Sequence, residues 1–256
     1  MLPAVSALFF ASLALPAEPV VLLAKPRLTV SFEATPEIFP ESWRDQEIKA
    51  TAESIDPEEQ PTALKTVQSA LTKYPQAVIE SNLKTVHVTR SLSFYGLNYG
   101  GTNSSDAVYL TLMPGRRLTT FSHLFLERTF HHEFSSILLR NYWNQFPEKD
   151  WNQALPAEFK YRGNGTQSVR EGTASTRYSD QYNSLGFLAE YSTSSLEEDF
   201  NMLAEGLFSG DPRFWKIYDN YPLIAKKADL IITFYNRIDP TFTKPAIRQL
   251  AQASNR

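Results

Sequence analysis

The chain contains no cysteine among its 256 residues, and this absence removes several kinds of chemistry at once. Without thiols there are no disulfide bonds, thiolate metal ligands, cysteine nucleophiles or lipidated N-terminal cysteines. Histidine is also scarce, so any metal ion must be held by a few histidine, aspartate or glutamate side chains. The four histidines of the chain are His87, His123, His131 and His132.

An excess of charge of either sign is missing as well. The 25 basic residues nearly balance the 28 acidic residues, which gives a net charge of −3 at pH 7. Proteins that bind nucleic acid or anionic membranes through phosphate groups usually carry a basic excess, so we expect neither partner. The chain also lacks a G-x-S-x-G motif, a phosphate-binding loop and a G-x-G-x-x-G motif. Serine hydrolysis and nucleotide binding are therefore not expected.

The N-terminus carries the longest apolar run, LPAVSALFFASLAL over residues 2–15. Its length and the small residues that follow predict a cleaved signal peptide over residues 1–17, although no lysine or arginine precedes the run. The run is short for a membrane helix, so we expect no membrane span in the mature chain. Hydrophobic residues make up 42% of the sequence, and no linker or repeat divides it. We therefore expect one secreted or periplasmic domain over residues 18–256.

Alternating β-branched and apolar residues predict strands over residues 27–33, 83–94 and 106–113. A glycine-rich turn separates the last two, which we expect to be neighbours. Helical spacing predicts a helix of about three to four turns over residues 61–75 and three helices from residue 196 to Pro240, where a tail begins. The polar segments are predicted to be a surface connection (41–60) and loops with short strands over a groove (145–184).

A long helix is predicted to begin near Thr119, because the next twenty-odd residues contain neither glycine nor proline. Apolar side chains recur along it at helical spacing and predict a buried stripe. The stripe consists of Leu126, Phe130, Phe134, Ile137 and Leu138. The opposite face carries His132, Glu133 and Ser136, with Thr129 and Arg140 among them, and we expect it to line a cleft.

The segment His132-Glu133-Phe134-Ser135-Ser136 is the most informative motif. In zinc peptidases, HExxH on a helix places two imidazoles one turn apart, with a glutamate that deprotonates the metal-bound water. His132 and Glu133 match the first half of this motif, with Glu133 in the catalytic position. Ser136 stands where the second imidazole is required.

With its flanking residues, HEFSSIL resembles the HEFxHIL helix of a family of zinc-binding metallopeptidases of exported bacterial proteins. These are gluzincin-like relatives of the catalytic domain of anthrax lethal factor. Three further segments recur in matching order over roughly residues 60–238: a helix ending in KYP, a tyrosine followed by EDF, and YPLIAKKADLIITFY. The resemblance implies an α/β (α+β) zincin-like fold, with a small mixed sheet packed on a long central helix and a helical C-terminal half.

The third zinc ligand implied by the resemblance is a glutamate in an EDFAE-like helix. On the simplest register, Met202 occupies that position. A thioether is a poor zinc ligand, so the two substitutions at Ser136 and Met202 predict weak or absent zinc binding. Glu198 and Glu205 lie seven residues apart on one helix face and are alternative metal ligands beside His132.

The remaining histidines have competing interpretations. His123, Glu127 and His131 are spaced by four residues and could join a metal site. Their face overlaps the apolar stripe, so a buried histidine–glutamate pair is the favoured interpretation. His87 lies within a predicted strand, where a structural role is favoured over metal binding.

The leading functional hypothesis is an exported metallopeptidase-like protein with a decayed zinc site that binds peptides or cell-surface polymers. One alternative is an active metallohydrolase with non-standard ligands drawn from His131, His132, Glu198 and Glu205. Another is a scaffold protein without a ligand. Tyrosines in the loop-rich segment are expected to line the substrate groove. They are Tyr161, Tyr178, Tyr182 and Tyr191.

Overall fold

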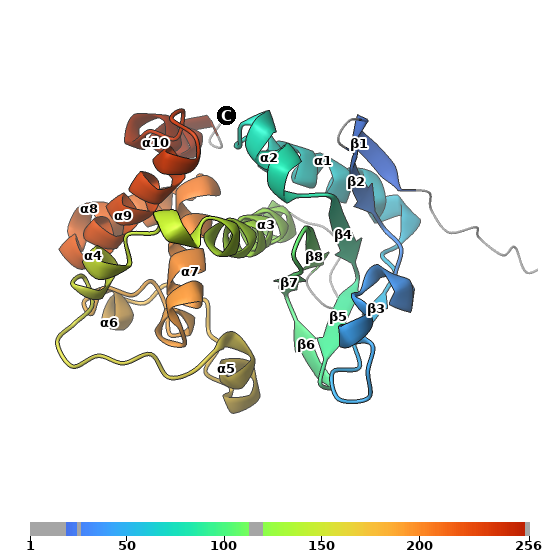
Figure 1. Cartoon of the computed structure of the whole chain (residues 1–256), viewed down its shortest axis with the longest axis horizontal. Helices are drawn as coiled ribbons and strands as arrows, with labels where there is room; N and C mark the ends of the chain where they lie inside the picture. The colour runs from blue at the N-terminus through green and yellow to red at the C-terminus, as the bar shows by residue number, and fades with distance from the viewer. Residues whose placement is uncertain (1–18, 25–26, 113–119, 254–256) are drawn as a thin grey trace, which may run out of the picture.

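The computed structural model describes residues 19–24, 27–112 and 120–253 of the chain. It is a mixed α/β structure in which a long helix lies between the strands and the C-terminal helices (Figure 1). This arrangement confirms the predicted combination of a small sheet, a central helix and a helical C-terminal half. The predicted signal peptide over residues 1–17 lies outside the described residues.

The larger sheet has five strands in the order β1-β2-β4-β8-β7. The two inner pairings, β2 with β4 and β4 with β8, are parallel, while β1 and β7 pair antiparallel at the edges. Within the described residues, β7 therefore has one neighbouring strand, and its other edge is unpaired. The strands are β1 (Val20–Ala24), β2 (Arg27–Ser31), β4 (Thr85–Thr89), β8 (Ala107–Thr111) and β7 (Gly101–Asn103).

A smaller antiparallel sheet has the order β3-β5-β6. Its strands are β3 (Thr51–Glu53), β5 (Ser91–Phe94) and β6 (Leu97–Tyr99). The segment predicted as a glycine-rich turn thus contains two short strands, β6 and β7. The single strand predicted over residues 83–94 is two strands, β4 and β5, which lie in different sheets, and β4 is the predicted neighbour of β8. β4 and β8 pair in parallel, and a tight turn cannot join two parallel strands. The chain between them forms β5 and β6 of the smaller sheet before it returns to the larger sheet.

Ten α-helices lie within the described ranges, and none of them is both long and apolar enough to cross a bilayer. Pro212 and Pro222 each stand in the first turn of a helix, where proline is tolerated because that turn lacks intrahelical N–H partners. The helices are α1 (Gln60–Leu71), α2 (Gln76–Asn82), α3 (Thr120–Asn141), α4 (Glu148–Asn152), α5 (Gly165–Glu171), α6 (Asp180–Asn183), α7 (Leu196–Phe208), α8 (Pro212–Asn220), α9 (Pro222–Ile238) and α10 (Lys244–Ala253).

Two predictions for the polar and terminal segments are corrected by these assignments. Residues 145–184 form loops and short helices rather than loops and short strands. The expected tail after Pro240 contains α10, whose Ile247 is buried against the core. The helices predicted after residue 196 are confirmed as α7, α8 and α9.

The central helix α3 is buried around its whole circumference over ten consecutive residues, Phe130 to Leu139. The predicted apolar stripe is confirmed, because each of its five side chains is fully buried. The opposite face is covered as well, since α7 packs along it. His132, Glu133 and Ser136 therefore lie between two helices, with His132 and Glu133 each 8% exposed.

His87 in β4 is a buried side chain, although its Nδ1 has no hydrogen-bond partner among the described residues. Its ring stacks on Tyr109 with the ring centres 4.9 Å apart, and only 9% of the residue is exposed. Burial lowers the pKa of His87 to about 4. The unfolded chain binds a proton at His87 near pH 6.5, so between pH 6.5 and 4 the unfolded state binds more protons and stability falls as pH falls.

Replacing His87→Phe keeps an aromatic ring on Tyr109 and removes this titration. When the pH is lowered from 7.5 to 4.5, the unfolding free energy of the wild-type protein should fall by about 2–3 kcal/mol more than that of the variant. Urea unfolding of both proteins at the two pH values measures this difference. An identical pH dependence in the two proteins would show that His87 is not held neutral by the fold.

Candidate functional site

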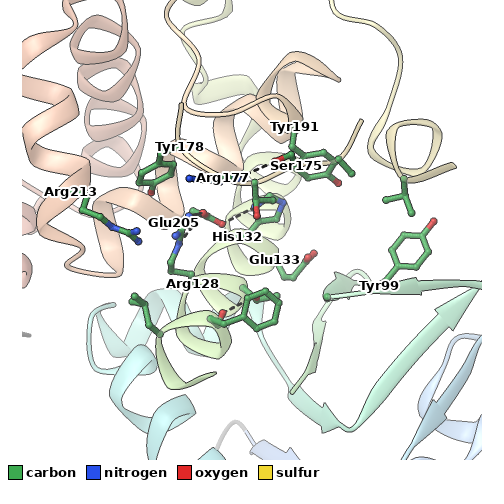
Figure 2. A pocket seen from close by; sticks show the side chains of 18 of the residues that line it. Tyr99, Arg128, His132, Glu133, Ser175, Arg177, Tyr178, Tyr191, Glu205 and Arg213 are labelled. Carbon is green, nitrogen blue, oxygen red and sulfur yellow. Dashed lines mark hydrogen bonds and ion pairs between the residues drawn. The ribbon is translucent and has the colours of Figure 1, made fainter. Parts of the chain in front are cut away.

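The candidate site lies where α3 faces α7. Ser195 caps α7 by accepting a hydrogen bond from the backbone N–H of Glu198, which fixes where the helix begins. The seven-residue spacing then places Glu198 and Glu205 on the face that meets His132. Figure 2 shows His132 and Glu205 pointing toward one another, with Glu133 beside them.

Both ring nitrogens of His132 are engaged by carboxylates. Nε2 lies 3.0 Å from Oε2 of Glu198, and Nδ1 lies 3.2 Å from Oε2 of Glu205. Burial alone would lower the pKa of His132, but these two carboxylates raise it well above its usual value. His132 is therefore held as an imidazolium that donates to Glu198 and Glu205.

Arg128 extends this group of charges, which we call the His132 cluster (Arg128, His132, Glu198 and Glu205). Its guanidinium forms a two-point ion pair with Oε1 of Glu205, with Nε at 3.1 Å. Burial would raise the pKa of Glu205, but Arg128 and His132 together hold it below its usual value. The cluster is thus a continuous chain of paired charges between α3 and α7.

Ser136, one turn beyond His132, is also held by α7. Its hydroxyl donates to Oε1 of Glu197 at 2.7 Å and accepts from Nδ2 of Asn201 at 2.6 Å. Ser135 donates to Oδ1 of the same asparagine at 2.7 Å. The position of the missing second imidazole is therefore filled by a complete hydrogen-bond network.

The register of α7 differs from the simplest sequence alignment. Met202, predicted to stand at the ligand position, is fully buried within the apolar core. Glu198 and Glu205 make the contacts to His132 instead. All residues of α7 from Asp199 to Phe208 are buried, so contacts on every side of the helix hold its rotation.

Glu133 is positioned by a strand on the other side of α3. Its Oε2 accepts a hydrogen bond from Nδ2 of Asn103 at 2.8 Å, and Arg140 holds the same asparagine through its Oδ1 at 2.8 Å. Burial raises the pKa of Glu133 to about 7, while His132 and Asn103 oppose the shift. A Cβ added to Gly101 would lie 2.5 Å from Thr129, so only glycine allows β7 to approach α3 this closely.

Zinc, which the sequence resemblance implies, does not fit this donor set. A protein zinc site needs three or four ligands whose lone pairs converge on one point. The two nitrogens of His132 point to opposite sides of its ring and face different carboxylates, and Arg128 already binds Glu205. Within residues 19–24, 27–112 and 120–253, no group of three or more histidine, aspartate or glutamate residues could hold a metal ion.

The other histidines of α3 lie outside the site. His131 is fully buried, and its Nδ1 lies 2.8 Å from the hydroxyl of Tyr74. Its Nε2 is 3.7 Å from Glu127, whose main partner is Lys73. His123 contacts Thr66, with Nδ1 3.3 Å from Oγ1. The pair of His131 and Glu127 is thus looser than predicted, because Lys73 takes the carboxylate.

A cavity of about 1000 Å³ opens beside the His132 cluster. Of the four tyrosines predicted to line a groove, Tyr178 and Tyr191 lie on its wall. Tyr182 lines a smaller adjacent cavity of about 410 Å³. Tyr161 lines neither cavity; it is half-buried, and its hydroxyl donates to Asp199 at 2.9 Å. Other lining residues, including Tyr99, were not predicted, because their segment was interpreted as a turn.

The edge of β7 contributes backbone groups to this cavity. The carbonyl of Gly100 accepts a hydrogen bond from the backbone N–H of Thr111 at 3.0 Å. Because hydrogen-bonded pairs alternate along an antiparallel ladder, the N–H and C=O of Gly101 point away from β8. Gly100 and Gly101 both line the cavity, so this free strand edge is available to a ligand.

No family model and no curated protein matches the chain. A similar solved structure is that of a protein from Bacteroides caccae named "putative zinc-binding metallo-peptidase". The two chains share 15% sequence identity with a TM-score of 0.48, over 76% of this chain and 79% of that chain. A likeness this distant assigns neither metal nor activity, so the function of this chain is inferred from its own side chains.

Proposed function

We propose that this chain is an exported metallopeptidase-like protein that binds extended peptide segments and does not hydrolyse them. The observation that carries the proposal is the engagement of both nitrogens of His132 by Glu198 and Glu205. The HExxH-like segment supports descent from a zinc peptidase, and paired charges occupy the position where a metal would be required.

The shape and chemistry of the cavity support an extended peptide as the ligand. Its volume of about 1000 Å³ is at the upper end of ordinary ligand sites. The outward-pointing backbone of Gly101 offers the hydrogen bonds through which peptides add to a strand edge. Aromatic side chains on the wall, including Tyr99, Phe125 and Tyr191, provide surface for apolar side chains of such a peptide.

The proposal is tested with a library of random hexapeptides incubated with the purified protein and analysed by mass spectrometry. We expect peptides to be retained in equilibrium dialysis and recovered intact. Cleaved peptides would favour the alternative of an active metallohydrolase. The absence of any retained peptide would favour a scaffold protein, or a ligand that is a polymer other than peptide, and would contradict the proposal.

Variants that remove one aromatic ring from the cavity wall test whether the cavity is the binding site. Tyr99→Leu and Tyr178→Leu should each weaken peptide binding by about fivefold to tenfold, because each removes aromatic surface that contacts the ligand. Trp143→Leu is the matched control, since this aromatic side chain is exposed and lines neither cavity. Equal affinity in all three variants would place binding elsewhere.

A further inference from the structure

One wall of the cavity carries three basic side chains, Arg177, Arg213 and Lys216, which we call the basic wall. Arg177 comes from the segment before α6, and the other two come from α8. Figure 2 shows Arg177 and Arg213 on the same side of the cavity as Tyr178. Arg213 also lies over the Tyr178 ring, 5.7 Å from its centre.

The positive charge on this wall is not balanced by the protein. Arg213 is paired with Asp211 at 2.6 Å. Arg177 and Lys216 have no carboxylate within ion-pair distance in the part of the chain that the structure describes. The one acidic residue that lines this wall, Asp180, accepts a hydrogen bond from the hydroxyl of Tyr221 at 3.1 Å.

The nearby acidic groups are committed to other partners. Glu205, at the base of the wall, is bound by Arg128 and His132. Glu190, which shares the smaller cavity with Arg177, lies 3.8 Å from Arg162. Two exposed cations, Arg177 and Lys216, therefore line the cavity without an anion paired to them among the described residues.

We infer that the basic wall binds a carboxylate of the bound peptide, through ion pairs from Arg177 and Lys216. This inference rests on the proposed function and adds the anchoring group of the ligand. Arginine and lysine recognise carboxylates as charged hydrogen-bond donors. A peptide carries a carboxylate at its C-terminus or on an aspartate or glutamate side chain.

The test measures fluorescence polarisation of three dye-labelled random hexapeptide libraries with the full chain. One library has a free C-terminus, the second is amidated, and the third is amidated with a fixed aspartate. The library with a free C-terminus should bind at least tenfold more tightly than the amidated library. This affinity ratio should be smaller at high salt. If the aspartate library binds as tightly as the free library, an aspartate side chain can supply the carboxylate as well as the C-terminus can. This result would also support a carboxylate site on the basic wall.

Charge-neutralising variants locate the anchoring group. Arg177→Gln and Lys216→Gln should each reduce the preference for the free C-terminus over the amidated library several-fold. Arg44→Gln and Lys65→Gln are the matched controls, because both residues are exposed and line neither cavity. These controls should keep the full preference.

Two results would overturn the inference in different ways. Equal binding of all three libraries, or a preference that survives both basic-wall variants, would contradict the carboxylate site and leave peptide binding intact. Failure of all three libraries to bind would contradict the proposed function and the carboxylate site together.

Discussion

Replacing Lys227→Met should cost about 3–5 kcal/mol of unfolding free energy, because it leaves a buried carboxylate without its partner. Lys227 of α9 is fully buried, and its Nζ lies 2.6 Å from Oδ2 of Asp199 in α7. The ammonium also lies 4.1 Å from the ring centre of Phe187. Methionine matches the length and apolar stem of lysine, so most of the loss reports the missing charge.

The loss should also depend on pH. Burial raises the pKa of Asp199 to about 6 even though Lys227 lowers it. Without the ammonium, this pKa rises further in the folded protein. A carboxyl group with a raised folded-state pKa loses stability as pH rises, because the folded state then binds more protons than the unfolded state. The variant should therefore be more strongly destabilised at pH 8 than at pH 5.

Urea unfolding at the two pH values measures both effects. Lys226→Met is the matched control, since Lys226 is the preceding residue of α9 and is exposed. Adding Asp199→Leu to Lys227→Met should recover part of the stability, because both charges are then gone. A loss below about 0.5 kcal/mol in the single variant, as is usual at surface sites, would show that the ion pair does not support the packing of α7 on α9.

Most helices could be predicted from the sequence because their signals are local. The apolar stripe of α3 and the proline-led starts of α8 and α9 depend only on residues within a few turns. The pairing of β4 with β8 could not be predicted in direction, since alternation identifies a strand and not its partner. β6 and β7 are three residues each and rich in glycine and asparagine, so they resemble a turn in sequence.

The candidate site was predictable in part for the same reason. His132 and Glu133 follow from a local motif, and the spacing of Glu198 and Glu205 places them on one helix face. The choice between these glutamates and Met202 depends on how α7 rotates against α3, which is decided by packing across the core. Arg128 was not singled out, because its role requires a partner 77 residues away in the chain.

The second large effect is expected from Ser136→His. This change places an imidazole one helical turn from His132, and Glu198 already lies 3.0 Å from Nε2 of His132. Each protein ligand contributes about 3 kcal/mol to the free energy of zinc binding. The variant should therefore bind zinc about 100-fold more tightly than the wild-type protein. The gain should be partial, since the new side chain displaces the hydrogen bonds of Ser136 to Glu197 and Asn201.

Two variants serve as controls for this gain. Ser136→Asn breaks the same hydrogen bonds and adds no strong zinc ligand, so its zinc affinity should stay at the wild-type level. Combining Ser136→His with His132→Ala should abolish the gain, because only one imidazole then remains. If Ser136→His folds and binds zinc no better than Ser136→Asn, α7 prevents the ligands from converging.

Zinc titration of the wild-type protein by calorimetry, with elemental analysis of the purified chain, tests the central claim most directly. A site in which Glu198 and Glu205 hold His132 as an imidazolium should take up well below one zinc ion per chain, and the His132→Ala variant should behave in the same way. Tight binding of one zinc ion per chain that is lost in His132→Ala would contradict the account, because the His132 cluster would then be a metal site.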